Sequence, residues 1–202
     1  MPTVIRDQPT STEVRAQLAA EARPVLVAFS GGKDAIAAEL ALQDAGVETV
    51  LAHLYYIPGR QPGRTLDFVE RGLTDLEQAL GKPIHRYPHP SFYRWLNNFV
   101  FQPPERCEVI EAAQLPTPNY QTMWELIRRD LGLPADTWVA DGVRAADSIV
   151  RRASFVRHGL MKTHSRKVSP VADWLKAEVL DRIEQAGIRL PVDYDLFGRS
   201  FD

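Results

Sequence analysis

The sequence predicts an α/β fold: a doubly wound, mostly parallel five-stranded sheet with helices on both faces. Short apolar runs of strand length alternate with longer segments of helical periodicity along the 202 residues. This alternation is typical of a parallel sheet whose strands are joined by helical crossovers. The first apolar run, residues 25–29, has no polar position, as expected for a central strand that is buried on both faces.

Length and composition agree with one ordinary globular domain. Hydrophobic residues make up 45% of the chain and charged residues 25%, which are usual values for a protein with a buried core. We predict an N-terminal helical extension over residues 1–23, one main domain over residues 24–198 and a tail over residues 199–202.

The charge balance and the apolar pattern argue against several kinds of partner. The net charge of −2 provides no overall basic surface for nucleic acid. No apolar run approaches the roughly 18 residues of a membrane span, and residues 1–23 lack the apolar core of a signal peptide. The single cysteine, Cys107, excludes an intrachain disulfide and a Cys-rich zinc site. We therefore expect a cytoplasmic protein with no membrane or nucleic-acid partner.

The N-terminal half contains three predicted helices and three predicted strands. In order, they are a helix capped by Ser11 or Thr12 and ending near Glu21, a strand at 25–29, a helix from Asp34 to Gly46, a strand at 49–55, a helix capped by Thr65 and ending at Gly81, and a strand at 84–87. Glycine suits both helix ends because it adopts the left-handed conformation readily. The third helix has apolar residues at steps of three and four, which predicts one buried face.

The C-terminal half is predicted with the same two periodicities. Its elements are an aromatic helix at 91–99, a helix capped by Asn119 and ending near Leu131, a strand at 137–140, a short strand near 167–169, and a last helix capped by Asp173 and ending at Gly187. Between the first two helices, residues 100–118 hold four prolines and little periodicity. We predict that this segment is a mobile loop over the site.

The turn after the first strand carries the most chemistry. Ser30-Gly31-Gly32-Lys33-Asp34 joins an apolar strand to a helix. Adjacent glycines let the backbone approach a ligand closely, and a helix N-terminus attracts phosphate. Ser30 adds a hydroxyl and Lys33 a positive charge, whereas Asp34 would repel a bare phosphate and so indicates Mg²⁺. The spacing fits neither the Walker A loop nor the dinucleotide fingerprint.

A second group of polar residues follows the strand predicted at 137–140. Residues 144–167 contain seven Arg or Lys against one acid, Asp147, a local charge of +6. Arginine suits phosphate or sulfate because its planar fork donates two hydrogen bonds. The predicted anion-binding residues are Arg151, Arg152, Arg157, Lys162, Arg166 and Lys167; the alternative is a solvated helix face. Because carboxyl ends of parallel strands share one edge, residues 141–144 are expected beside the glycine turn.

Both segments resemble signatures of a known family. Ser30–Asp34 resembles the Ser-Gly-Gly-x-Asp-Ser loop of the PP-loop ATP pyrophosphatases, with Ala35 in place of the second serine. Gly142-Val143-Arg144 with Asp147-Ser148 resembles the second signature of phosphoadenylylsulfate (PAPS) reductases, with Asp147 in place of glutamate. Pro170-x-x-x-Trp174 and Leu190-Pro191 with Tyr194 are similar to that family's later pattern. The likeness covers about residues 24–198.

The resemblance implies an adenine nucleotide alpha hydrolase-like fold that binds ATP or a sulfonucleotide together with Mg²⁺. Lys33 and Asp34 are the candidate catalytic residues, and Asp34 is also the candidate metal ligand. The candidate nucleotide-binding residues are Ser30, Gly31, Gly32, Ala35, His53, Gly142 and Arg144. For His53, at the end of the second predicted strand, a purely structural role is an equal alternative. No iron–sulfur cluster or zinc is expected.

The reaction stays open among three alternatives. Reductases of this family use a C-terminal cysteine, but no cysteine follows Cys107, which we interpret as an ordinary thiol. The first alternative is an ATP pyrophosphatase that adenylates an acceptor. The second is reduction of PAPS or adenylylsulfate, which needs a thioredoxin-type donor or a partner protein that completes the site. The third is a non-catalytic nucleotide-binding subunit. A homo-oligomer is a further candidate assembly.

Overall fold

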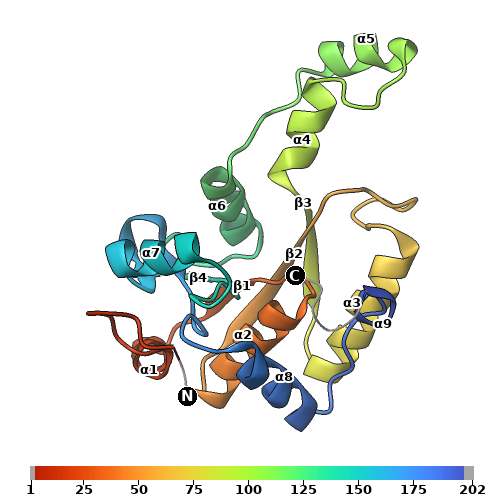
Figure 1. Ribbon diagram of the computed structural model, residues 1–202. Coiled ribbons are helices and arrows are strands. Elements are labelled where there is room, and N and C mark those ends of the chain that lie inside the picture. Colours follow the sequence, from red (N-terminus) through yellow and green to blue (C-terminus); the bar gives the residue numbers. More distant parts are fainter. Residues whose placement is uncertain (1–2, 198–202) are drawn as a thin grey trace.

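A sheet forms the centre of the protein in the computed structural model, which describes residues 3–197. Within these residues the strand order is β3-β2-β1-β4-β6-β5. The strands are β1 Val25–Ala28, β2 Thr49–Tyr55, β3 Ile84–Pro88, β4 Val139–Ala140, β5 Met161–Lys162 and β6 Lys167–Val168. All neighbours pair in parallel except β5, which is antiparallel to β6. The predicted doubly wound, mostly parallel α/β fold is confirmed (Figure 1).

The predicted number of strands was wrong, because the described sheet has six strands instead of five. The additional strand is β5, a two-residue edge strand with one charged position. So short a segment has no periodicity that could mark it in the sequence. Strand β4 is also shorter than the strand predicted at 137–140. In β4, Val139 and Ala140 are the residues that pair with both neighbouring strands.

Helices cover both faces of the sheet (Figure 1). Successive residues of β1 point to opposite faces: Val25 and Val27 belong to the larger core, and Leu26 to the smaller one. The larger core is completed by α1 Ser11–Glu21, α2 Lys33–Asp44, α3 Asp67–Leu80, α7 Ile149–His158 and α8 Lys176–Gln185. In the smaller core, α6 Tyr120–Asp130 supplies Trp124 and Ile127.

Three helices have N-cap residues other than the predicted ones. Thr10 caps α1, and its hydroxyl accepts a hydrogen bond from the Glu13 amide at 3.2 Å. Helix α3 begins after Leu66, and α8 begins after Leu175. The side chains of Thr65 and Asp173, which were the predicted caps, have tertiary partners instead: the Ile57 carbonyl at 2.8 Å and the Ser11 amide at 2.9 Å. The predicted cap of α6 by Asn119 is confirmed, since its side chain accepts from the Thr122 amide at 2.9 Å.

The segment predicted as a loop over the site contains a helix instead. Helices α4 Pro90–Asn97 and α5 Pro104–Ala113 form an arm that projects from the body, and α5 lies at its far end (Figure 1). Proline at the start of α5 is compatible with a helix, because the first helical amides need no intrahelical partner. None of the residues of α5 is buried within the described chain, so the sequence shows no apolar periodicity there.

Two further helices were not predicted. Ser148 caps α7, and its hydroxyl accepts from the Arg151 amide at 3.2 Å. Helix α8 is followed by α9 Asp193–Phe197, so it is not the last helix. The tail predicted at 199–202 lies outside the described residues. None of the described helices has the length and apolar character that crossing a membrane requires.

Candidate functional site

The glycine turn connects the carboxyl end of β1 to the N-terminus of α2. Gly31 has a φ of 82°, a conformation that glycine adopts without steric cost. The Ser30 hydroxyl accepts a hydrogen bond from the Gly32 amide at 3.3 Å, and Gly32 is the N-cap residue of α2. The turn therefore presents the positive end of a 12-residue helix at the carboxyl edge of the sheet.

Two buried cations flank the carboxylate of Asp34. Lys33 Nζ lies 3.2 Å from Asp34 Oδ2, and Arg144 Nε lies 2.9 Å from Asp34 Oδ1. The side chain of Lys33 is 1% exposed and that of Arg144 is 3% exposed, whereas Asp34 retains 28% exposure. Buried cations of this kind are stable only beside negative charge. The cluster therefore holds two cations at the N-terminus of α2, where Asp34 faces both and Asp147 also pairs with Arg144.

The loop that bears Arg144 is packed directly on the start of α2. A Cβ atom on Gly142 would lie 2.5 Å from the carbonyl carbon of Asp34 and 2.6 Å from its oxygen, so only glycine permits this approach. Asp147 then links two arginines, with Arg144 Nη2 and Arg151 Nη1 each 2.6 Å from its carboxylate. The structure thus brings together the two segments that the sequence placed at one edge.

A cavity of about 520 Å³ opens beside the glycine turn. It lies between α3 and residues 189–194, and its lining includes Phe68, Arg71 and Arg189 as well as Ser30–Gly32. Sequence reasoning missed these three side chains, because Phe68 and Arg71 lie on a helix and Arg189 in a linker, none of them within a motif. A cavity of this size, with apolar walls and a few polar groups, is typical of small-molecule sites.

Tyr194 contacts the glycine turn from the C-terminal segment. Its hydroxyl accepts a hydrogen bond from the Lys33 amide at 3.0 Å, and it lies 3.2 Å from the position of a Cβ atom on Gly32. Burial raises the pKa of the Tyr194 phenol, so the hydroxyl keeps its proton at neutral pH. An oxygen at this helix N-terminus occupies a position that also suits an oxygen of a phosphate group.

The one acidic side chain of the glycine turn, Asp34, is the candidate ligand for a magnesium ion that a bound nucleotide would share. Within residues 3–197 no group of three or more His, Cys, Asp or Glu side chains could hold a metal ion. Asp34 Oδ1 is buried and forms an ion pair with Arg144 Nε at 2.9 Å, although their geometry is not that of a hydrogen bond. Mg²⁺ is commonly held by one carboxylate together with substrate phosphates. Asp34 could supply that carboxylate.

His53 lies in β2 and contacts the strand that precedes the turn. Its Nδ1 is 3.0 Å from the carbonyl oxygen of Phe29, the residue before Ser30. The ring is 8% exposed, and burial lowers its pKa, so we expect it to be neutral at pH 7 with the proton on Nδ1. In this position His53 holds the end of β1 in place.

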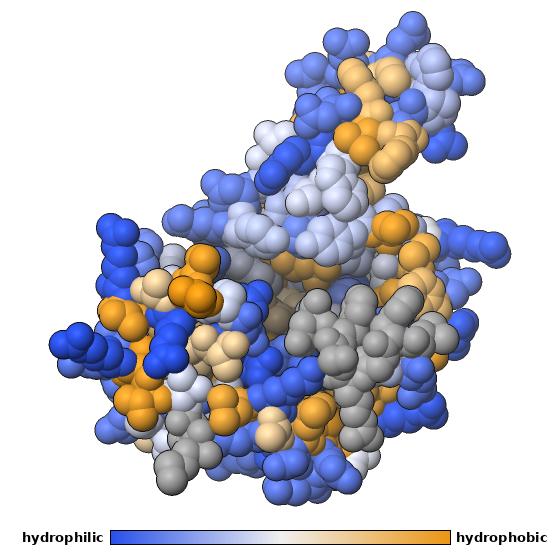
Figure 2. Space-filling model, in the orientation of Figure 1, coloured by the Kyte–Doolittle hydropathy of each residue, from blue (hydrophilic) through white to orange (hydrophobic). Residues whose placement is uncertain are grey.

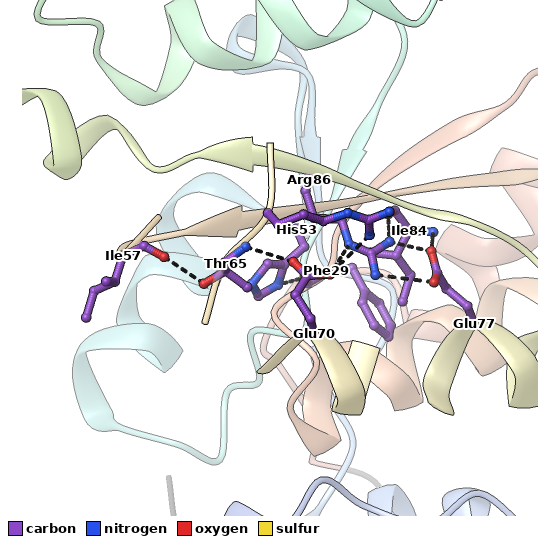
Figure 3. Close-up of polar contacts among 9 residues, drawn as sticks. Phe29, His53, Ile57, Thr65, Glu70, Glu77, Ile84 and Arg86 are labelled. Carbon is purple, nitrogen blue, oxygen red and sulfur yellow. Dashed lines mark hydrogen bonds and ion pairs between the residues drawn. The ribbon is translucent and has the colours of Figure 1, made fainter. Parts of the chain in front are cut away.

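A network of ion pairs lies beside His53 (Figure 3). Arg86 pairs with Glu70 at 3.2 Å and with Glu77. Glu70 also accepts a hydrogen bond from the Thr65 amide at 2.8 Å. These contacts join β3 and α3 to the loop after β2, and α3 forms one wall of the cavity. The network therefore fixes that wall.

Asp141 shapes the turn after β4. Its Oδ1 accepts hydrogen bonds from the Ser169 hydroxyl at 2.7 Å and from the Val143 amide at 3.2 Å. Burial raises the pKa of its carboxyl group above the usual range. Asp141 thereby orients the loop that carries Gly142 and Arg144.

The structure does not gather the predicted anion-binding residues in one place. Arg151 pairs with Asp147, Arg152 donates to the Val4 carbonyl at 3.3 Å, and Arg157 is exposed. The charged groups of Lys162, Arg166 and Lys167 lie over the aromatic rings of Phe155, Trp138 and Tyr120, respectively. Arg166 precedes β6 and lies 3.5 Å from Asp136, at the amino edge of the sheet, opposite the glycine turn.

Ala35 follows Asp34 in the first turn of α2 and is buried. It brings no hydroxyl to the glycine turn, in contrast to the serine of the PP-loop pattern. Cys107 lies on α5, away from α2 (Figure 1), and its thiol is 3.6 Å from the Pro103 carbonyl.

Comparison with known proteins supports the fold. No protein-family model matches the chain, and no curated protein matches its sequence. The phosphate complex of PAPS reductase from Candida auris is similar with a TM-score of 0.50 and 13% identity over 94% of this chain and 85% of that one. NMN synthetase from Francisella tularensis is similar with a TM-score of 0.50 and 12% identity over 89% of this chain and 70% of that one.

Both solved proteins have the adenine nucleotide alpha hydrolase fold of the PP-loop superfamily, and this chain shares that fold. The resemblance inferred from Ser30–Asp34 and Gly142–Ser148 is therefore confirmed at the level of the fold.

Proposed function

We propose that this protein binds an adenine nucleotide at the carboxyl edge of the sheet, with its phosphates at the N-terminus of α2. The observation that carries the proposal is the pair of buried cations, Lys33 and Arg144, on either side of Asp34 at that N-terminus. Helix dipole and cations act in the same direction on an anion. The cavity of about 520 Å³ beside the glycine turn supports the proposal, because its size is typical of small-molecule sites.

We further propose that the nucleotide is ATP and that the reaction transfers AMP. An acceptor oxygen attacks the α-phosphorus, the bond to the bridging oxygen of the β-phosphate breaks, pyrophosphate leaves, and the acceptor proton passes to solvent. Lys33 and Arg144 would stabilise the charge that develops on the phosphate oxygens. Asp34 would hold Mg²⁺ together with the phosphates, and the ion would supply additional positive charge.

The position of Cys107 favours ATP over reduction of a sulfonucleotide by the chain's own thiol. Cys107 lies on α5 at the far end of the arm, away from α2 and the glycine turn (Figure 1). Thiolate attack requires the sulfur within reach of the substrate. Binding of PAPS or adenylylsulfate is the second candidate, because one solved neighbour is a PAPS reductase. It would require a thioredoxin-type donor or a thiol from another protein.

The experiment is an assay of pyrophosphate release from Mg-ATP, with water and small alcohols as acceptors. We expect pyrophosphate release that Arg144→Ala abolishes and Cys107→Ser leaves intact. Arg144 lies at the glycine turn, whereas Cys107 lies on the arm. Binding of ATP without release from any acceptor would contradict cleavage and favour a non-catalytic nucleotide-binding subunit. Sulfite release from PAPS or adenylylsulfate that depends on an added thiol would favour the second candidate.

A further inference from the structure

The arm, residues 90–113, ends in a helix, α5, that the rest of the described chain leaves uncovered. Helix α5 has ten residues, and none is buried within the described chain. A helix this short is marginally stable in water unless packing supports it. The elbow between α4 and α5 contains Phe99 and Phe101, both with φ near 55°, a strained conformation for a bulky side chain. Phe101 is also 99% exposed.

The root of the arm is nevertheless fixed to the body. The ring of Tyr56, after β2, stacks on His89 at 3.9 Å and on Trp95 of α4 at 5.6 Å between centroids. His89 caps α4, and its Nε2 lies 2.6 Å from the hydroxyl of Tyr120 at the start of α6. The arm is therefore held in a defined direction, as an element that reaches a binding surface must be.

The exposed side of α5 combines apolar and acidic side chains. Val109 is 68% exposed, and the helix carries Glu105, Glu108 and Glu111 against one basic residue, Arg106. Glu105, Glu108 and Val109 are spaced by three and four residues, so they lie on one face. The arm thus presents an apolar surface with excess negative charge.

Helix α7 presents the opposite charge on an apolar surface. Ile149 is 88% exposed and Val150 78%, and the helix contains three arginines and no acid. Ile149, Arg152 and Val156 follow steps of three and four residues and share one face. Hydrophobic side chains gather both at the end of the arm and over α7 (Figure 2). We define the α7 face as the exposed residues Ile149, Val150, Arg152, Val156 and Arg157.

We propose that the arm of one copy of this chain docks on the α7 face of a second copy, and that the second arm docks reciprocally on the first. The arm and the α7 face lie on separate parts of one molecule (Figure 1), and they match in apolar character and are opposite in charge. A two-fold dimer joins such a pair of surfaces twice and leaves neither unpaired. Docking would cover Phe101 and support α5, both of which stay exposed within residues 3–197 of the single chain.

The first test is the mass of the full chain by sedimentation velocity or light scattering at increasing concentration. We expect a dimer of twice 22.7 kDa. Phe101→Asp and Ile149→Asp each replace a side chain that is almost fully exposed, so both variants should fold, as circular dichroism can verify. Each should raise the dimer dissociation constant at least tenfold. A chain that stays monomeric up to about 100 μM, or a dimer that neither variant weakens, overturns the proposal.

A charge exchange tests which surfaces meet. Reversal of the α5 glutamates (Glu105, Glu108 and Glu111→Lys) should weaken the dimer at least tenfold, and so should Arg152→Glu with Arg157→Glu. The two sets together in one chain should restore association, since the arm of one copy meets the α7 face of the other. Glu184→Arg, an exposed reversal on α8, is the control and should change nothing. Failure of the combined variant to restore the dimer contradicts docking of the arm on α7.

Discussion

At the scale of single residues, Lys33 carries the strongest prediction. Its ammonium group is 3.2 Å from Asp34 and is buried at the N-terminus of α2. A charged hydrogen bond to a ligand contributes about 1.5–3 kcal/mol, so Lys33→Ala should weaken nucleotide binding by roughly 10- to 150-fold. Calorimetric titration measures the change. Arg129→Ala, which removes an exposed cation from α6, is the matched control, and equal losses in both variants would contradict a local role for Lys33.

Gly142 gives a prediction about close packing. A methyl group there would lie 2.5 Å from the backbone of Asp34, so Gly142→Ala must displace the loop of Arg144 from α2. We expect lower stability and loss of nucleotide binding. Gly72 lies within α3 with no atom of the described residues within 4 Å of its Cβ position, and Gly72→Ala should stabilise the fold by about 0.4–1 kcal/mol. Urea denaturation of both variants measures this, and a Gly142→Ala variant as stable as Gly72→Ala would exclude the close packing.

His53 predicts a dependence of stability on pH. Burial lowers its pKa in the folded state, whereas the unfolded value is about 6.5. Below about pH 6.5 the unfolded chain therefore binds a proton that the folded chain does not, and the free energy of unfolding falls as pH decreases from 7 to 5. His53→Gln should reduce this dependence of the free energy of unfolding on pH. Part of the dependence should remain, because burial also lowers the pKa of His89.

Denaturation series at pH 5, 6 and 7 measure the effect of His53. His158→Gln on the exposed end of α7 is the control. An unchanged slope in His53→Gln would show that this ring is not the group that titrates.

The sequence could predict the candidate site only where residues follow a strand directly. Ser30–Asp34 and Gly142–Arg144 were found because a short motif follows an apolar strand, and the structure places both at one edge. Arg71 and Arg189 reach the cavity through the packing of α3 and of residues 189–194, which has no local signal. Arg166 was grouped with the site by its neighbours in sequence, but the register of β6 places it at the other edge.

At the scale of elements, the network around Arg86 fixes the wall of the cavity. The Arg86 side chain is 7% exposed, and its loss leaves Glu70 and Glu77 largely buried without their main cation. We expect Arg86→Met to destabilise the fold by about 2–4 kcal/mol, because removal of one partner from a buried ion pair is costly. Thermal and urea denaturation measure the loss.

Arg64 is the matched control for Arg86 because it contacts the same glutamate. Arg64 lies 3.1 Å from Glu70, but its side chain is 50% exposed. Solvent screens such a pair, so Arg64→Met should cost only about 0–1 kcal/mol. Similar costs for the two variants would contradict the importance of burial in this network.

Element prediction succeeded where burial imposes a pattern and failed where it does not. The alternation of β1 with α2 and the apolar stripe of α3 are direct consequences of a buried face. Helix α5 buries no residue in the described chain, and α7 buries only Phe155, so neither shows a helical stripe. Strands β4 and β5 are two residues long, too short for any periodicity.

At the scale of the whole molecule, the fold brings the two buried cations Lys33 and Arg144 to one edge of the sheet. The parallel order β2-β1-β4 places the turn after β1 next to the turn after β4. Gly142 lets these two turns touch, and Lys33 and Arg144 meet at Asp34. These residues form the proposed binding site for the phosphates of an adenine nucleotide.

The most direct test is calorimetric titration of the protein with Mg-ATP, adenylylsulfate, PAPS and adenosine 3′,5′-bisphosphate in parallel. We predict binding of Mg-ATP that is weakened in Lys33→Ala and preserved in Arg129→Ala. Preference for the sulfated or 3′-phosphorylated ligands would keep the nucleotide site but replace ATP with a sulfonucleotide. Binding of none of the four ligands would contradict the claim that the glycine turn and Arg144 form a nucleotide site.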